Sequence, residues 1–261
     1  MNTLTKISLS LLTITATYGI ADAQQIKMGD LITICNAKLK KDVKPDTFQA
    51  YFTKEFAPSW NKDKPGESIH LLMADRGDRK GDFLLVCRNN PADRKANSHR
   101  SPFADTRLSE FLSKPDSYTQ YQLIGAEKFD SMRSVGILGI HYIKVKPGRS
   151  KEFEKFVVEK LHPAVGQLLP DMQLLYYKAV AGENLGSYIT IFAIESIGAR
   201  DKYWPTGAPE TELLKQAFRP LNNLAVELDP YLVEGSYLEP PAGAAAYFES
   251  KEWTDFVNQG L

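Results

Sequence analysis

Hydrophobic and polar positions alternate along the first half of the chain in a pattern that predicts strands and helices in a definite order. The expected elements are an extended run, an amphipathic helix, two strand-like runs, a second helix and a last strand: 31–41, the stretch through Phe48 and Phe56, 68–74, 82–88, 103–112 and 121–125. The two strand-like runs are joined by a short polar segment that contains glycine, which is typical of a hairpin.

The second half of the chain repeats this order. Its expected elements are 135–146, the stretch through Phe153 and Leu161, 172–180, 187–195, 210–228 and 231–235. In the first helix of each half, apolar residues and a proline recur at a constant spacing of 105 residues: Phe48, Tyr51, Phe56 and Pro58, then Phe153, Phe156, Leu161 and Pro163. Each half therefore predicts β-α-β-β-α-β, the ferredoxin-like order, and the chain reads as an internal duplication.

The duplication predicts how the two halves pack. Two helices can cover only one face of each four-stranded antiparallel sheet, yet the runs 68–74 and 172–180 are apolar on both faces. The simplest cover for the second face is the sister sheet. We therefore expect an α+β fold in which repeats 24–130 and 131–239 form one barrel within the chain. After them, 240–243 is expected as a linker and 244–257 as a C-terminal helix that docks on the barrel.

Three segments of the second half carry a family resemblance: the run His141-Tyr-Ile-Lys-Val-Lys-Pro-Gly148, the helix from Phe153 to His162-Pro163, and the strand pair 174–195. The chain resembles the dimeric α+β barrel superfamily, in particular its NIPSNAP, EthD-like and antibiotic-biosynthesis-monooxygenase-like branches. The resemblance implies a fold rather than an activity. Families of this fold include cofactor-free oxygenases, haem enzymes and proteins without assigned chemistry, and fold alone does not choose among them.

Charge and motifs narrow the function classes. The 261 residues contain 32 Lys and Arg and 32 Asp and Glu, so the formal net charge is zero. That balance argues against a nucleic-acid partner or an anionic membrane partner. The sequence contains no P-loop, dinucleotide-binding glycine fingerprint, HExxH or Gly-x-Ser-x-Gly motif, which gives nucleotide-binding and hydrolase functions little support.

The N-terminus reads as a signal peptide over residues 1–23. Lys6 precedes a mostly apolar stretch (7–20), and Ala21-Asp22-Ala23 supplies a small-x-small cleavage site before Gln24. An uncleaved anchor is the alternative, but the apolar stretch is shorter than the roughly 20 residues that a membrane-spanning helix needs. We expect a periplasmic or secreted protein that leaves the membrane after cleavage.

Export changes how the two cysteines are interpreted. Cys35 and Cys87 lie in strand-like runs that are the first and third strands of the first repeat, and these strands are neighbours in a ferredoxin-like sheet. An oxidising compartment favours a disulfide between them. The alternative is two separate buried thiols, which are common in apolar strands.

His162 and His141 are the candidate catalytic residues. At the spacing of 105 their first-half counterparts are Ala57 and Asn36, so both positions changed between the copies. His162 follows the amphipathic helix and either serves acid–base or ligand-binding chemistry or caps that helix. If His141 faces the barrel interior, it can act as a general base or a haem ligand; if it faces the helices, it is a core residue.

Aromatic residues of the second half are the candidate ligand-binding residues: Tyr176, Tyr177, Tyr203 and Trp204. They can line an apolar pocket, or they can be ordinary packing. No metal site is predicted, and the sequence does not indicate which cofactor, if any, the protein binds. We expect a protein that binds a small, partly apolar molecule as a monomer or homo-oligomer. The alternative is a cofactor-free or haem-dependent oxidoreductase of the monooxygenase type that acts on a small organic substrate.

Overall fold

The structure, a computed structural model, describes residues 27–64, 66–77, 79–89, 106–113, 118–126, 135–168, 172–205, 211–233 and 253–259. The predicted signal peptide, the linker at 240–243 and the first part of the predicted C-terminal helix lie outside these residues.

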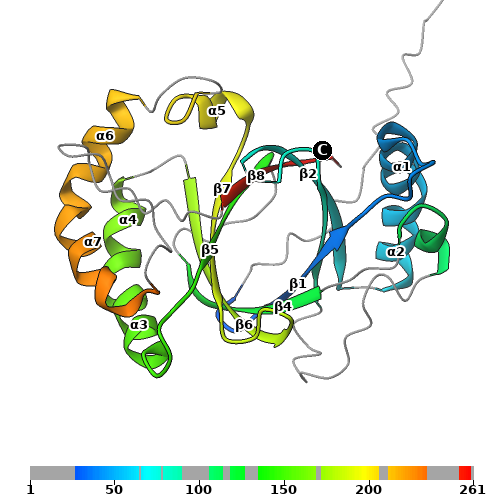
Figure 1. The fold of residues 1–261 in the computed structure, drawn as a ribbon. Helices are drawn as coiled ribbons and strands as arrows, with labels where there is room; N and C mark the ends of the chain where they lie inside the picture. The colour runs from blue at the N-terminus through cyan, green and yellow to red at the C-terminus, as the bar shows by residue number, and fades with distance from the viewer. Residues whose placement is uncertain are drawn as a thin grey trace, which may run out of the picture.

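Eight strands form a closed antiparallel barrel, and helices cover it on two opposite sides (Figure 1). The strands are β1 (Leu31–Ala37), β2 (Ser68–Gly77), β3 (Phe83–Arg88), β4 (Tyr118–Ala126), β5 (Ile137–Ile143), β6 (Met172–Gly182), β7 (Tyr188–Ile194) and β8 (Trp253–Asn258). The expected α+β barrel within one chain is confirmed.

Each half contributes a four-stranded sheet with the same internal order. The first is β4-β1-β3-β2 and the second is β8-β5-β7-β6. β4 pairs with β6, and β2 pairs with β8, so two seams join the sheets and close the barrel. Closure pairs the edges that an open sheet would leave to other chains.

The first helical region of each half is one continuous helix with a π-helical turn in its middle. The segments are α1 (Pro45–Tyr51), the π turn Phe52–Phe56 and α2 (Ala57–Asp63), then α3 (Ser150–Phe156), the π turn Val157–Leu161 and α4 (His162–Leu168). Pro58 and Pro163 lie just after the π turns. Proline cannot donate to the carbonyl four residues earlier and its ring crowds that carbonyl, so the widened turn accommodates it.

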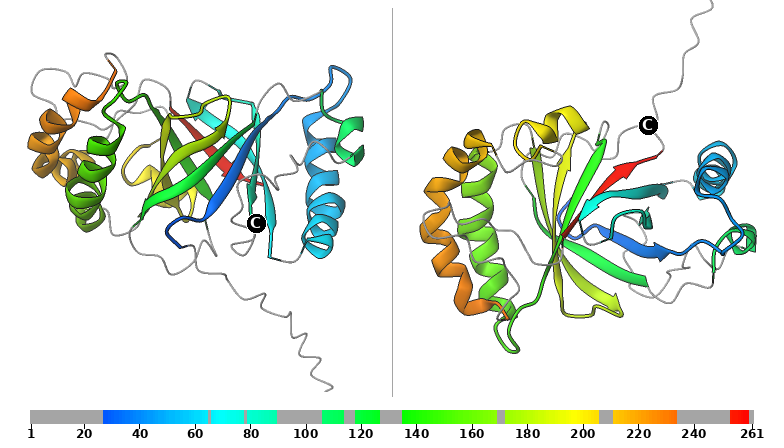
Figure 2. Two further views of the ribbon diagram at one scale, coloured as in Figure 1. Left: turned by 90° about the horizontal axis from the view of Figure 1, so that it is seen from below. Right: turned by 45° about the horizontal axis from the view of Figure 1, so that its top comes forward.

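The second helical region is longer in the second half. There α6 (Glu212–Phe218), a 3-10 turn (Arg219–Leu221) and α7 (Asn222–Leu228) lie beside α3 and α4 (Figure 2). A short helix, α5 (Ile197–Asp201), follows β7, and the described part of the first half has the 3-10 helix Thr106–Glu110 in the corresponding region. Within the described ranges, no helix has the length and apolar character needed to cross a membrane.

Apolar side chains fill three regions of the molecule. One cluster lies inside the barrel and includes Ile34, Leu84, Ile140 and Ile189. The other two lie between each sheet and its helices. The barrel interior is therefore a packed core, and the polar groups of interest must be sought on the faces that the helices cover.

The end of the chain does not form the expected helix at 253–257. These residues belong to β8, which pairs with β2 on one side and β5 on the other. The apolar spacing in such a short run fits a helix and a strand equally well, so periodicity could not distinguish them. The two open strand edges decide the outcome, because they need a partner for their backbone hydrogen bonds.

The expected final strand of the second repeat at 231–235 is also wrong in its described part. A 3-10 turn covers Asp229–Tyr231, and Leu232 makes a single bridge to Val145. Leu112 makes the same bridge to Leu39 in the first half. The counterpart of β4 in the second sheet is therefore β8.

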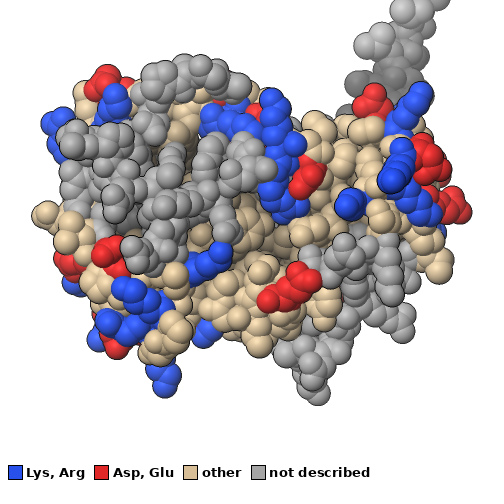
Figure 3. Space-filling view, in the orientation of Figure 1, with Lys and Arg blue, Asp and Glu red and all other residues tan. Residues whose placement is uncertain are grey.

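Charged side chains of both signs lie over both helix layers on the face shown in Figure 3. Several form ion pairs within one turn of helix, such as Arg149 with Glu152 and Lys215 with Glu212. Exposed pairs of this kind stabilise a protein little. The mixed signs agree with the neutral net charge.

Gly182 is the last residue of β6, and replacing it measures how closely the strands at the β4–β6 seam are packed. Its φ is +92°, and a methyl group there would overlap the carbonyl oxygen of Tyr118 on the neighbouring strand. We expect Gly182→Ala to lower the free energy of unfolding by about 2–5 kcal/mol, from backbone strain and overpacking together. Urea unfolding of the purified chain measures this loss.

Gly186 provides the matched control. Its φ is +83°, but a methyl group there would have no atom within 4 Å. Gly186→Ala should therefore lose only about 1–2 kcal/mol, the strain of a left-handed residue. Equal losses in the two variants would contradict the close approach at Gly182.

Candidate functional site

The structure brings most of the predicted site residues to one face. His141 on β5 and Tyr176 on β6 point from the second sheet toward its helices, while His162, Tyr203 and Trp204 come from the layer that covers it. Tyr177 is the exception. It points into the barrel core, where burial raises the pKa of its hydroxyl, so the structure places it apart from these five residues, and its role in binding a ligand stays a prediction.

Three polar side chains lie next to one another across this face, and we call them the polar row. The register places His141 opposite Thr190 of β7, and Thr190 opposite Tyr176. Residues paired in this way have Cβ atoms about 4.5–5.5 Å apart. Thr190 is 6% exposed. Sequence analysis missed it, because only the strand register shows that it stands between the two predicted residues.

His162 lies directly over the polar row. It begins α4 within the continuous helix, so it does not cap a helix end. Its ring meets the ring of Tyr176 edge-on, with centroids 5.8 Å apart. Its Nε2 is buried and has no hydrogen-bond partner among the described residues. Burial lowers the pKa of His162, so the imidazole is neutral at pH 7.

His141 occupies the other end of the polar row. The sequence did not decide which face of the sheet this side chain occupies. In the structure it points toward the helices, and its ring centroid lies 5.3 Å from that of Phe192. Burial lowers its pKa to about 4. Phe192 in turn lies 5.9 Å from Trp204. A neutral imidazole therefore stands beside an aromatic wall.

Five charged residues form a network beyond His141. Asp255 of β8 accepts from Arg76 Nε at 2.5 Å and from Arg200 Nη1 at 3.4 Å, both at Oδ2. Arg200 also donates to Asp75 at 2.7 Å and to Asp201 at 2.9 Å. The Arg200 side chain is only 1% exposed, and a buried charge requires such partners. The network joins both halves and the last strand.

Strand register shows which residues of the two halves are equivalent. Ala37 lies opposite Phe83, and Ile143 lies opposite Tyr188. The first strands therefore correspond at a spacing of 106, while the first helices and the hairpins keep 105. The counterpart of His141 is thus Cys35 rather than Asn36.

The first half is apolar where the second half is polar. Cys35, Leu85 and Leu71 occupy the positions of the polar row. Ala57 occupies the position of His162. The same architecture therefore packs an apolar core in one half and four polar side chains in the other.

Cys35 and Cys87 form no disulfide in the structure. The neighbouring strands place Cys35 opposite Leu85 and Cys87 opposite Thr33, so the cysteines are diagonal neighbours. Diagonal positions are about 7–8 Å apart, beyond the usual Cα separation of a disulfide of about 4.4–6.8 Å. The two thiols lie buried beneath the first helix layer.

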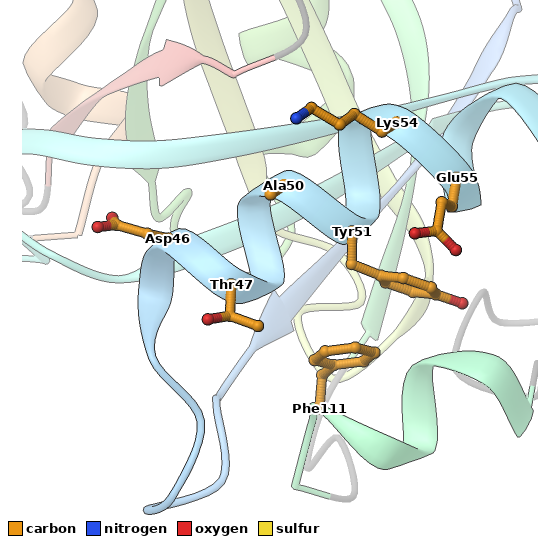
Figure 4. A pocket seen from close by; sticks show the side chains of 7 residues that line it. All are labelled: Asp46, Thr47, Ala50, Tyr51, Lys54, Glu55 and Phe111. Carbon is orange, nitrogen blue, oxygen red and sulfur yellow. The ribbon is translucent and has the colours of Figure 1, made fainter.

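A groove of about 630 Å³ lies on the outside of the first half (Figure 4). The ring of Tyr51 stacks on that of Phe111 at 4.5 Å, and Asp46, Lys54 and Glu55 lie exposed around it. None of the predicted site residues lines this groove. It lacks the buried polar groups that mark the second half, and we do not assign the site there.

Among the described residues, no group of three or more His, Cys, Asp and Glu side chains is placed to hold a metal ion. The polar row and His162 instead offer neutral hydrogen-bonding groups within an apolar layer. Such an arrangement suits a small organic ligand with few polar atoms.

No family model and no curated protein matches the sequence. Solved structures do match. One is a candidate monooxygenase from Fusobacterium nucleatum subsp. nucleatum ATCC 25586, with 10% identity, 90% of this chain and 94% of that chain covered, and a TM-score of 0.52. Another is a candidate monooxygenase from Lactobacillus acidophilus NCFM, with 11% identity, 88% and 94% coverage, and a TM-score of 0.50. At such low sequence identity, these structural matches show a shared α+β barrel fold alone.

The burial of His141 predicts how stability depends on pH. The unfolded chain protonates this residue near pH 6.5, whereas the folded protein does so only near pH 4. Stability should therefore fall as the pH drops from about 6.5 to about 4, by at most about 3 kcal/mol from this group. Urea unfolding at pH 7 and at pH 4.5 measures the loss.

His141→Cys, which installs the first-half residue, is the comparison for this prediction. The variant should lose less stability than the natural chain between the two pH values, because Cys adds no proton there. An identical loss in both proteins would show that protonation of other groups causes the pH dependence.

Proposed function

We propose that this protein binds a small, partly apolar and uncharged organic molecule on the helix-covered face of its second half. The supporting observation is the difference between the halves at equivalent positions. His141, Thr190, Tyr176 and His162 stand where the first half has Cys35, Leu85, Leu71 and Ala57. The first half is then the structural cover that completes the barrel.

The energetics favour a role for these polar groups. A buried donor or acceptor without a partner costs about 1–3 kcal/mol, and the first half shows that this fold packs apolar residues at the same positions. His162 Nε2 carries such a cost. A ligand with a hydroxyl or carbonyl group would offset it.

An enzyme of the monooxygenase type, cofactor-free or haem-dependent, is the second candidate. It is favoured by the unpaired Nε2 of His162, since a neutral buried imidazole can accept a proton from a substrate or bind haem iron. The two solved structures described as candidate monooxygenases share the fold only. Assignment to the NIPSNAP, EthD-like or antibiotic-biosynthesis-monooxygenase-like branches stays a prediction.

Cleavage before Gln24 and function outside the cytoplasm are part of the proposal, and they rest on the N-terminal sequence. N-terminal sequencing of the protein recovered from the exported fraction tests them. An intact Met1 in that fraction would contradict cleavage.

Substitutions that install first-half residues test the site. Tyr176→Leu, Thr190→Leu and His162→Ala should each reduce retention of a co-purified molecule at least tenfold, because each removes a hydrogen-bonding group. The melting temperature should stay the same or rise, since equivalent apolar residues already pack in the first half. Native mass spectrometry measures retention, and an absorption spectrum shows whether the molecule is haem.

Leu85→Thr is the matched control, because it makes the reverse exchange at the equivalent position of the first half. It should leave retention unchanged. If the three second-half variants keep the molecule as the natural chain does, the polar row is structural. If neither a co-purified molecule nor benzyl alcohol, used as a probe in ligand-observed NMR, binds the natural chain, the proposed function is wrong.

A further inference from the structure

The charged network beside the polar row points to the chemistry of the ligand. Asp255 Oδ1 and His141 Nε2 converge on Gly139 of β5. A methyl group on Gly139 would stand 2.9 Å from Asp255 Oδ1, 3.9 Å from His141 Nε2 and 3.6 Å from Phe192 Cβ. One carboxylate oxygen, one imidazole nitrogen and one aromatic side chain therefore border a single point on the helix-covered face.

The two oxygens of Asp255 have different surroundings. Arg76 and Arg200 both donate to Oδ2, while Oδ1 is the oxygen beside Gly139. Two guanidinium groups contact this carboxylate, so it is already paired and a ligand need not bring a counter-charge to it. Oδ1 is a strong hydrogen-bond acceptor on the side of the carboxylate that faces Gly139.

His141 complements this acceptor. Its pKa of about 4 keeps the imidazole neutral at pH 7, so the ring carries one N–H and one acceptor nitrogen. A hydroxyl group can donate to Asp255 Oδ1 and accept a second hydrogen bond from the imidazole N–H of His141. The wall formed by Phe192 and Trp204 suits an apolar or aromatic body attached to that hydroxyl.

The β4–β6 seam has different residues at all three equivalent positions. Gln120 stands at the position of Asp255, Ala181 at that of Arg76 and Thr33 at that of Gly139. The carboxylate, its guanidinium partner and the glycine that makes room for it are therefore all particular to the β2–β8 seam, to which Arg76 comes from the first half and Asp255 and Gly139 from the second. A role limited to barrel closure does not require them, because the β4–β6 seam closes without them.

We propose, resting on the proposed function above, that the ligand is a neutral molecule with a hydroxyl group, and that Asp255 and His141 select that hydroxyl. Asp255 acts as a specificity-determining residue that the last strand of the chain brings to the site. Arg76 and Arg200, which donate to Oδ2, hold the carboxylate in place, and their positive charges disfavour a positively charged ligand nearby.

Four small aromatic probes that differ only in their polar group test this proposal: benzyl alcohol, benzyl methyl ether, benzylammonium and benzoate. Dissociation constants come from ligand-observed NMR titrations of the full mature chain at pH 7. Benzyl alcohol should bind at least tenfold more tightly than the ether, which cannot donate. Benzylammonium and benzoate should bind no more tightly than the ether.

The Asp255→Asn variant tests whether Asp255 causes the preference for the alcohol over the ether. The amide keeps the shape but replaces a charged acceptor, so the alcohol-to-ether preference should fall to less than about threefold. Asp82→Asn, the same change on an exposed hairpin residue, should keep the full preference. Because loss of a buried ion pair can prevent folding, a thermal melt accompanies each variant. If Asp255→Asn does not fold, the probe series on the natural chain decides alone.

The outcomes separate this inference from the proposed function. If the alcohol and the ether bind equally, and Tyr176→Leu weakens both, the site stands and selection of a hydroxyl is overturned. Tighter binding of benzylammonium or benzoate overturns it as well. If no probe binds, or binding is insensitive to Tyr176→Leu and His162→Ala, the proposed function itself fails.

Discussion

Closure of the barrel is the constraint on which the rest of the structure depends. A four-stranded sheet leaves two edges of unpaired N–H and C=O groups, and each half of this chain has such a sheet. One seam closes by direct pairing of β4 with β6. The other closes in the same way by pairing of β8 with β2; β8 also pairs with β5, as β4 pairs with β1. The last strand therefore completes both the second sheet and the barrel.

Closure also explains where charge is buried. β8 places Asp255 at the seam, where it meets Arg76 from the first half and Arg200 from the second. At the other seam the equivalent residue, Gln120, lies opposite Ala181, and its side-chain amide has no hydrogen-bond partner among the described residues. The seams share a backbone pattern and differ in electrostatics.

The duplication, the barrel and the order of the elements before the last strand could be predicted from sequence because they rest on repeated apolar spacing. Phe48 and Phe153 mark the same helix turn, and the prolines that follow produce the same π turn. The face of His141 could not be predicted. The connection after the first strand differs by one residue between the halves, and a shift of one residue turns a strand side chain to the opposite face.

Residue type revealed part of the candidate site, and only the strand register revealed the rest. His141, Tyr176 and His162 stood out by residue type, whereas Thr190 and Asp255 became members through pairing across strands. Asp255 was hidden further because a short apolar run fitted a helix as well as a strand. In a duplicated chain the informative comparison is thus between positions that pairing makes equivalent. At those positions polar groups gather on one face of one half, and a site that needs hydrogen bonds from a dry, rigid wall requires that distribution.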